Sequence, residues 1–232
     1  MSRRLRWLIA VPVAALVLIV GGTWFYFHVI EGPAPKKFSL SSGSTATTAA
    51  DAPAATGPFT LAGSWKPTSS SQVGYRVKET LFGQSNTAVG RTNAITGDLV
   101  VDGTTVSTAT FTVDMTQVSS DRSQRDGQFR GRIMDVSSFP TATFKLVSPI
   151  SLPADPADKA QLDFKATGEL TLHGVTKSVT FSLKAQRNGS AIEVTGSIPI
   201  TFADYNVDNP SGGPAQVGDN GELEFLIVFQ HA

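Results

Sequence analysis

The chain has no cysteine, and its 232 residues include only three histidines, at His28, His173 and His231. Disulfide bonds, lipid attachment through a thiol, cysteine metal sites and a cysteine nucleophile are therefore excluded. The histidines show no H-x-x-H or H-E-x-x-H spacing, so neither a zinc site nor any other cofactor is expected. No G-x-S-x-G elbow accompanies His173, which we expect to face solvent or to cap one end of the fold.

An excess of charge is also missing, because 19 basic residues balance 19 acidic ones. A basic surface is the usual mark of a nucleic-acid-binding protein, so nucleic acid is not expected as a partner. A phosphate-binding glycine loop is absent as well, since neither a lysine nor a helix start follows the glycine-rich turn Ser211–Pro214.

The N-terminal region contains a long hydrophobic run, residues 7–30, without Asp, Glu, Lys or Arg. Its 24 residues suffice to cross a hydrocarbon core of roughly 30 Å as a helix. A cleaved signal peptide is the alternative, but the bulky residues Trp24–Phe27 suit a membrane interface better than a cleavage site. Arginines in the basic tail, residues 1–6, favour a cytoplasmic N-terminus. The sequence thus predicts a single-pass cell-membrane protein whose following domain lies on the extracytoplasmic side.

Residues 31–58 have a different composition, with 22 of 28 positions being Gly, Pro, Ala, Ser or Thr. Such a segment has too few large apolar side chains to build a core, and it predicts a flexible linker. The folded domain is then expected to span residues 59–232.

Within that domain apolar and polar residues alternate almost everywhere, which predicts strands. In Val175–Gln186 one face is mostly apolar and the other is polar. Similar segments are Val73–Leu81, Val89–Val101, Val106–Met115, Ala142–Val147, Gln161–Leu172, Ile192–Ile200 and Leu223–Phe229.

Short turns such as Asp102-Gly103, His173-Gly174 and Asn188-Gly189 join these segments and make consecutive strands antiparallel. We therefore predict an all-β fold, an antiparallel up-and-down barrel of about eight strands, because closure removes exposed strand edges. A two-sheet sandwich is the second interpretation.

One segment departs from this pattern. Between Asp121 and Asp135 the sequence holds four arginines and three aspartates. Phe129, Ile133 and Val136 follow helical spacing, so a short helix is predicted from Asp126 to Asp135, closing one end of the barrel. Arginines beside the carboxylates lower carboxylate pKa values, which favours a structural brace of Arg125, Asp126 and Asp135 over a general acid.

The apolar face of the strands is the remaining candidate site. Its predicted lining residues are Phe111, Val113, Met115, Phe164, Leu170, Leu172, Val179, Phe181, Leu183, Ile198, Ile200, Phe225, Ile227 and Phe229. An eight-stranded barrel can be filled by its side chains or can hold one ligand. Small inward positions, among them Ala109, Ala166, Gly168 and Gly196, favour a cavity.

Several motifs resemble those of the YceI-like family of bacterial envelope proteins. They include Trp65 and the segments VGYRV (Val73–Val77), RDGQF (Arg125–Phe129) and FPTATF (Phe139–Phe144). The segment GELTLHGVTK (Gly168–Lys177) is also similar to a hairpin of that family, and the likeness extends from Trp65 to Phe229.

This resemblance implies a lipocalin-like barrel that binds an isoprenoid lipid, such as a polyprenyl phosphate or a quinone tail, and that has no enzymatic activity. It also implies that the Arg-Asp helix closes the barrel. One departure is Thr201–Val207, where family members often carry an arginine that is absent from this chain. Any contact of that segment with a lipid head group is therefore in question.

The expected function is that of a membrane-anchored envelope protein carrying an isoprenoid chain. Two alternatives stay open: a filled barrel acting as a structural or stress-response adaptor, and an envelope hydrolase using Asp126, Asp135 or His173. Whether the chain forms a homodimer is also left open by the sequence.

Overall fold

The computed structural model describes residues 34–41, 59–81, 83–212 and 215–232. The predicted basic tail, the predicted membrane span and most of the predicted linker lie outside the described residues. In the described part of the chain, no helix is both long and apolar enough to cross a membrane. Lys36–Ala232 belong to one compact unit, which contains the folded domain.

The described residues of that unit form thirteen strand segments in one sheet. Their bounds are β1 Gly63–Pro67, β2 Gln72–Leu81, β3 Gln84–Thr92, β4 Ile95–Asp102, β5 Thr105–Asp114, β6 Ser119–Ser120, β7 Thr141–Leu146, β8 Ile150–Ser151, β9 Leu162–Leu172, β10 Val175–Asn188, β11 Ala191–Thr201, β12 Ala215–Val217 and β13 Asn220–His231. Helical segments are α2 Ser123–Gln128 and the short turns η2 Met115–Gln117, η3 Phe129–Ile133 and η4 Phe202–Tyr205.

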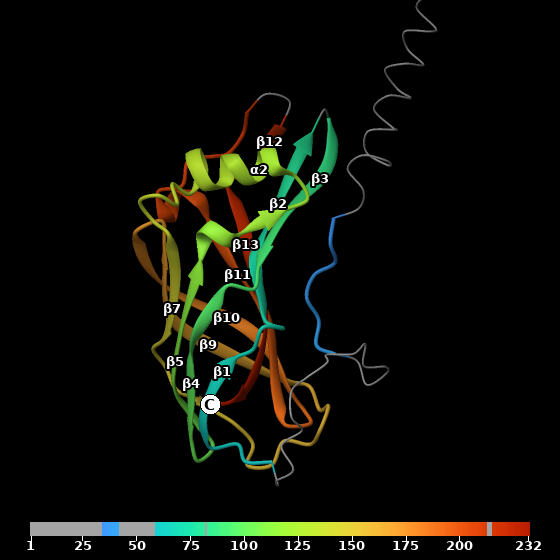
Figure 1. The fold of residues 1–232 in the computed structure, drawn as a ribbon, viewed down its shortest axis with the longest axis vertical. Helices are drawn as coiled ribbons and strands as arrows, with labels where there is room; N and C mark the ends of the chain where they lie inside the picture. The colour runs from blue at the N-terminus through green and yellow to red at the C-terminus, as the bar shows by residue number, and fades with distance from the viewer. Residues whose placement is uncertain (1–33, 42–58, 82, 213–214) are drawn as a thin grey trace, which may run out of the picture. The chain divides into compact units, whose positions relative to one another are not determined.

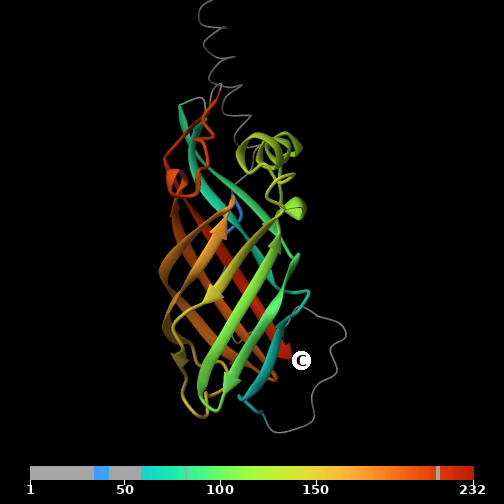
Figure 2. The same ribbon diagram turned by 90° about the vertical axis from the view of Figure 1, so that its left-hand side faces the viewer.

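The sheet closes into a barrel (Figures 1 and 2). Antiparallel pairing runs β1-β4-β5-β7-β9-β10-β11-β13, and β13 pairs back with β1. Strand β13 pairs with β2 as well, and β3 pairs with β2, so β1 and β2 act as two halves of one long strand, as do β3 and β4. Counted in this way the barrel has eight strands, each beside the next in sequence, which confirms the predicted up-and-down topology.

The two interrupted strands differ from the sequence-based expectation. The pattern predicts one strand over Val89–Val101, whereas the structure ends β3 at Thr92 and starts β4 at Ile95. The other interruption, between β1 and β2, is a tight turn. Its Thr68 N–H donates a hydrogen bond to the Val228 carbonyl oxygen of β13. The Ser71 hydroxyl donates to the same oxygen and accepts from the Val228 N–H. Ser71 is fully buried, and these bonds give the Val228 backbone the partners that a neighbouring strand would otherwise supply.

The predicted helix exists but is displaced. It begins at Ser123 rather than Asp126, and after Gln128 it widens into a π-helical turn through Ile133. Asp135, at φ +36°, then ends the helical path in a left-handed conformation. Phe129 is buried, as the predicted apolar stripe requires, and Figures 1 and 2 show the segment at one end of the barrel. The prediction missed the start because Ser123–Arg125 carries no apolar residue to reveal the period.

The end opposite the helix is tightly packed. Trp65 and Phe229 are the largest fully buried side chains of the described residues, and the indole N–H of Trp65 donates to the carbonyl of Leu61 at 2.9 Å. The ring of His231 packs against Trp65 in a tilted orientation, with ring centroids 4.0 Å apart. This aromatic cluster fills the barrel where β1 and β13 meet.

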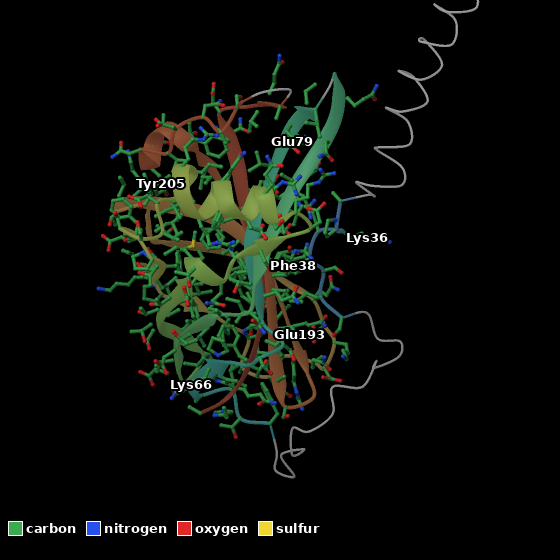
Figure 3. All side chains as sticks on the ribbon, turned by 45° about the horizontal axis from the view of Figure 1, so that its top comes forward. Lys36, Phe38, Lys66, Glu79, Glu193 and Tyr205 are labelled. Carbon is green, nitrogen blue, oxygen red and sulfur yellow. The ribbon has the colours of Figure 1, made fainter. Side chains whose placement is uncertain are left out.

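Residues Lys36–Ser41, which we call the strap, lie in the extended segment that precedes the barrel. Composition placed them in the flexible linker, but they belong to the same compact unit as the barrel and run along its outer wall (Figure 3). Leu40 is 4% exposed, as buried as a core residue. Phe38 and Leu40 are the two large apolar side chains of the linker, and averaging over 28 residues hides them.

Candidate functional site

The predicted lining residues come together inside the barrel. Thirteen of the fourteen belong to one hydrophobic cluster. Buried members are Phe111, Met115, Leu170, Leu172, Phe181, Ile198, Ile227 and Phe229, and partly buried members are Val113, Val179, Leu183, Ile200 and Phe225. The remaining one, Phe164, is half-buried and pairs in register with Leu183 on β10.

Burial of the inner wall changes along the barrel axis. On β13 the inward residues Ile227 and Phe229 are buried, whereas Leu223 and Phe225, closer to the helix, are only half-buried. On β2, which pairs with this part of β13, the inward residue Tyr75 is also half-buried. On β9 and β11 the order is reversed, because Leu172 and Ile198 near the helix are buried whereas Phe164 is half-buried. Accessible inner surface beside the helix is therefore a feature of β2 and β13.

A row of three rings crosses the barrel between these zones. Phe144 and Phe181 meet edge-to-face at 5.6 Å between centroids, and Phe181 meets Phe225 at 5.9 Å. The rings also occupy the room beside two glycines: a Cβ at Gly168 would stand 2.4 Å from Phe144 Cζ, and one at Gly196 would stand 2.8 Å from Phe225 Cζ. The expectation that these glycines leave empty space is therefore wrong, because neighbouring aromatic rings fill it.

Polar groups gather on the inner wall beside the helix. Glu79, on the same face of β2 as Tyr75, accepts a hydrogen bond from Asn86 Nδ2 at 2.8 Å and forms a salt bridge with Arg125 at 3.5 Å. Arg125 on α2 also pairs with Asp121. Two carboxylates thus surround this guanidinium, and the cluster carries no excess positive charge.

Tyr75 joins this cluster to the helix. Its ring stacks on Phe129 with centroids 5.0 Å apart. Burial, with the nearby carboxylates of Asp126 and Asp121 adding to it and Arg125 opposing it, raises the pKa of Tyr75 to about 12. The phenol therefore stays protonated at physiological pH and can donate a hydrogen bond.

The predicted brace residues have local structural roles. Asp126 is buried and accepts two hydrogen bonds from Ser120, from the backbone N–H at 2.8 Å and from the hydroxyl at 2.6 Å. These bonds tie α2 to β6. Asp135 accepts from the Ser137 hydroxyl at 2.6 Å in the turn that follows the helix. Its interactions with Ser137 and then Ser138 lower the pKa of Asp135, whereas a general acid needs a raised one.

His173 sits in the β9–β10 turn at φ +48°, followed by Gly174 at φ +74°. Its Nδ1 lies 3.1 Å from the carbonyl oxygen of Tyr205, and its ring meets Phe139 edge-on at 4.6 Å. The histidine thus links the hairpin to η4, which agrees with the interpretation that it caps one end of the fold.

Sequence reasoning missed Tyr75 and Glu79 as site residues. A signal existed, because Val73, Tyr75, Val77 and Glu79 share one face of β2 by alternation. A glutamate at an inward position of an otherwise apolar face predicts that a polar or basic side chain lies close to it. What the pattern lacked was the position of Arg125, which reaches Glu79 from 46 residues away in sequence.

A closed up-and-down barrel of eight strands with an apolar interior can be filled by its own side chains or can enclose one small ligand. Residues 64–229 match the YceI-like domain, and the chain belongs to this family. The resemblance seen in the sequence between Trp65 and Phe229 is thereby confirmed.

Two curated relatives show how much sequence this chain shares with other proteins. A UPF0312 protein of Vibrio parahaemolyticus is 35% identical over 127 residues, which cover 51% of this chain and 64% of that protein. A UPF0312 protein of Shewanella sp. strain W3-18-1 is 34% identical over 148 residues, covering 60% of this chain and 72% of that protein. The match thus spans slightly less than two thirds of the Vibrio relative.

Solved structures share the fold at low sequence identity. A polyisoprenoid-binding domain from Saccharophagus degradans, implicated in plant cell wall breakdown, superimposes with a TM-score of 0.60 at 16% identity over 74% of this chain and 99% of that one. BcnA of Burkholderia cenocepacia gives a TM-score of 0.55 at 20% identity, covering 70% of this chain and 98% of that chain. At these identities the comparison establishes the barrel fold alone.

Proposed function

We propose that this protein is a membrane-anchored, extracytoplasmic carrier that holds a long isoprenoid chain inside its barrel and catalyses no reaction. The observation that carries the proposal is a closed barrel with an apolar inner wall that keeps half-buried side chains beside the helix end, among them Leu223 on β13 and Tyr75 on β2. Accessible apolar surface at one end is expected of a barrel that admits a chain there. The polyisoprenoid-binding domain with the same fold supports the choice of ligand class.

Burial of the chain supplies the affinity. Each buried CH₂ contributes roughly 0.8 kcal/mol, so one five-carbon unit contributes about 3 kcal/mol before the entropic cost of ordering the ligand. Val179, Ile200 and Leu223 offer the half-buried apolar surface near the entrance. The ring row of Phe144, Phe181 and Phe225 would then contact the deeper part of the chain.

The polar cluster would receive the head group. Because Glu79 and Asp121 already surround Arg125, a dianionic phosphate there would meet two carboxylates at close range. Tyr75, held protonated by its raised pKa, supplies a neutral hydrogen-bond donor. The cluster therefore favours a neutral head group with acceptor oxygens, such as a quinone, over a polyprenyl phosphate.

Membrane anchoring rests on the sequence. The hydrophobic run of residues 7–30, preceded by three arginines, fits a retained signal anchor with the barrel outside the cytoplasm. A tether of this kind suits a protein that collects its ligand from the bilayer.

A filled barrel that serves as an envelope adaptor is the second candidate. The observation in its favour is the ring row, which fills the room beside Gly168 and Gly196. In that case no chain would pass Phe181, and function would depend on the outer surface.

Native mass spectrometry of residues 34–232, exported into a bacterial envelope and followed by organic extraction, separates the two candidates. A stoichiometric isoprenoid quinone would support the carrier. A ligand-free barrel that also refuses added quinones and polyprenyl phosphates would refute it and leave the adaptor.

A matched pair of variants locates the ligand. Leu223→Trp narrows the accessible inner wall and should reduce the bound fraction several-fold, whereas Val147→Trp, at a position 57% exposed, should leave it unchanged. Equal loss in both variants would place the ligand somewhere other than the inner wall.

A further inference from the structure

We propose that the outer wall of the barrel is a built docking site for the strap, Lys36–Ser41, and that this docking limits the distance between the barrel and the membrane. The second half of this statement rests on the proposed anchoring through residues 7–30. The first half concerns the folded unit alone, and the contacts of the strap carry it.

The C-terminal end of the strap is held by hydrogen bonds to β10 and β11. The backbone N–H of Ser41 donates to Glu193 at 3.0 Å, and its hydroxyl lies 2.8 and 2.9 Å from the two carboxylate oxygens. Gln186 Nε2 donates to the carbonyl oxygen of Ser41 at 2.9 Å. Both backbone groups of one strap residue are thus bonded to side chains of the wall, as in a bound peptide.

The N-terminal end of the strap is held by charge and by an aromatic ring. Arg91 on β3 donates to the carbonyl oxygen of Lys36 at 2.6 Å, and its guanidinium lies 3.9 Å from the centroid of the Phe38 ring. Lys37 pairs with Glu222 of β13 at 2.5 Å. A groove of about 260 Å³ borders Lys37 and Phe38, so the strap is attached at two points rather than along its whole length.

The wall beneath the strap is unusual for the polar side of a barrel. Glu193, Gln186 and Glu224 all point outward by the register of their strands, yet each is buried. An outward carboxylate is ordinarily solvated, and burial of a charge requires partners that replace water. For Glu193 the partners are Ser41, Gln186 and Asn188. Although burial opposes ionisation, hydrogen bonds from Asn188 and Ser41 lower the pKa of Glu193.

The consequence for the membrane follows from chain length. A free linker over residues 31–58 would have a root-mean-square span of about 30 Å and an extended reach of about 95 Å. With the strap docked, five residues lie between Ile30 and Lys36, and the six steps from one Cα to the next span at most about 20 Å. Docking would therefore shorten the free connection after Ile30 from 28 residues to five, and so limit how far the barrel can move from an anchored segment.

The test uses the full chain in lipid nanodiscs. The double variant Phe38→Ser and Leu40→Asp removes the ring that faces Arg91 and places a charge at the buried position next to Ser41. Val147→Asp adds a carboxylate at an exposed site as the matched control. Because the chain has no cysteine, Thr104→Cys in the β4–β5 turn gives a single position for a fluorescent label. Energy transfer from this label to an acceptor lipid reports the distance, and hydrogen exchange of the Ser41 amide reports docking.

In the protein carrying only the label substitution, we expect the Ser41 amide to be protected at least about tenfold over the double variant, since one buried hydrogen bond and its cover are lost. We also expect energy transfer in the double variant to fall and its distance distribution to widen, while Val147→Asp changes neither readout. A Ser41 amide that exchanges equally fast in both proteins overturns the docking site. Protection together with unchanged energy transfer overturns the claim that docking limits the distance.

These failures differ from failure of the anchor. If residues 7–30 do not hold the chain in the nanodisc, no energy transfer appears in any variant, and the distance claim falls together with the proposed anchoring. Hydrogen exchange of Ser41, measured on the same protein in detergent, still decides docking by the same tenfold difference.

Discussion

Two glutamates on neighbouring strands, Glu79 on β2 and Glu224 on β13, are each paired with arginine but on opposite sides of the barrel wall. Glu224 points outward between Arg76 at 2.9 Å and Arg91 at 2.7 Å, and its side chain is 3% exposed. Glu79 points inward, meets Arg125 at 3.5 Å, and its side chain is 11% exposed. In this region the outer carboxylate is therefore the better buried of the two.

The comparison shows that inside and outside do not correspond to buried and exposed in this barrel. Long arginine side chains and the strap cover the outer wall around β2, β3 and β13. The inner wall near the helix keeps accessible surface. A barrel that carries a ligand needs this arrangement, because stability has to come from parts that the ligand does not occupy.

Phe181→Ala should give the largest loss of stability, about 4 kcal/mol, because it removes the central ring of the row and opens a cavity. Urea unfolding of residues 34–232 measures it. The same variant should bind a longer or bulkier isoprenoid, which tests the inner wall independently of stability. A loss below about 1 kcal/mol would mean that the ring row does not hold the barrel together.

Glu224→Ala should destabilise the protein by about 3 kcal/mol, because it takes the buried carboxylate away from Arg76 and Arg91. Glu79→Ala should cost about 1 kcal/mol, since its pair is longer and closer to solvent. Thermal and urea unfolding of the two variants side by side measures the difference. An equal cost for both would remove the distinction between the walls.

Gly168→Ala should cost about 2 kcal/mol, because the new Cβ would stand 2.4 Å from Phe144 Cζ and 2.5 Å from the Lys145 carbonyl oxygen. Gly103→Ala is not a fair control because of its positive φ, so Gly127→Ala on α2, with open space around its Cβ, serves instead. We expect Gly127→Ala to be neutral or slightly stabilising. Thermal unfolding followed by circular dichroism compares the stabilities of the two variants, and equal stabilities would contradict the prediction.

Titration of Tyr75 should change the stability by less than Gly168→Ala does. Its pKa is raised from 10.0 to about 12 in the folded protein, so between these values the unfolded state has lost the proton that the folded state keeps. Stability is therefore complete below pH 10 and falls as pH rises, by up to about 1.4 kcal/mol at pH 11. Tyr75→Phe should remove this dependence of stability on pH, which urea unfolding between pH 9 and pH 11 measures. An unchanged dependence in the variant would mean that other groups cause it.

Much of the fold could be predicted because the alternation in Val175–Gln186 and its neighbours fixes which side chains face inward. Turns such as His173-Gly174 then fix the antiparallel order. The same parity identifies Glu79 as an inward charge. The helix start was missed because its first turn is polar, and the split of β3 from β4 was missed because the alternation continues across it.

The sequence by itself determined the strand order, the inner face and the family, since these depend on local period, short turns and a linear motif. Only the tertiary structure decided that rings fill the room beside Gly168 and Gly196, that Arg125 meets Glu79, and that the strap buries Glu193. Each of these depends on contacts between residues far apart in the chain, which local composition and periodicity do not encode. The strap is the clearest case, because Ser41 reaches Glu193 across 152 residues.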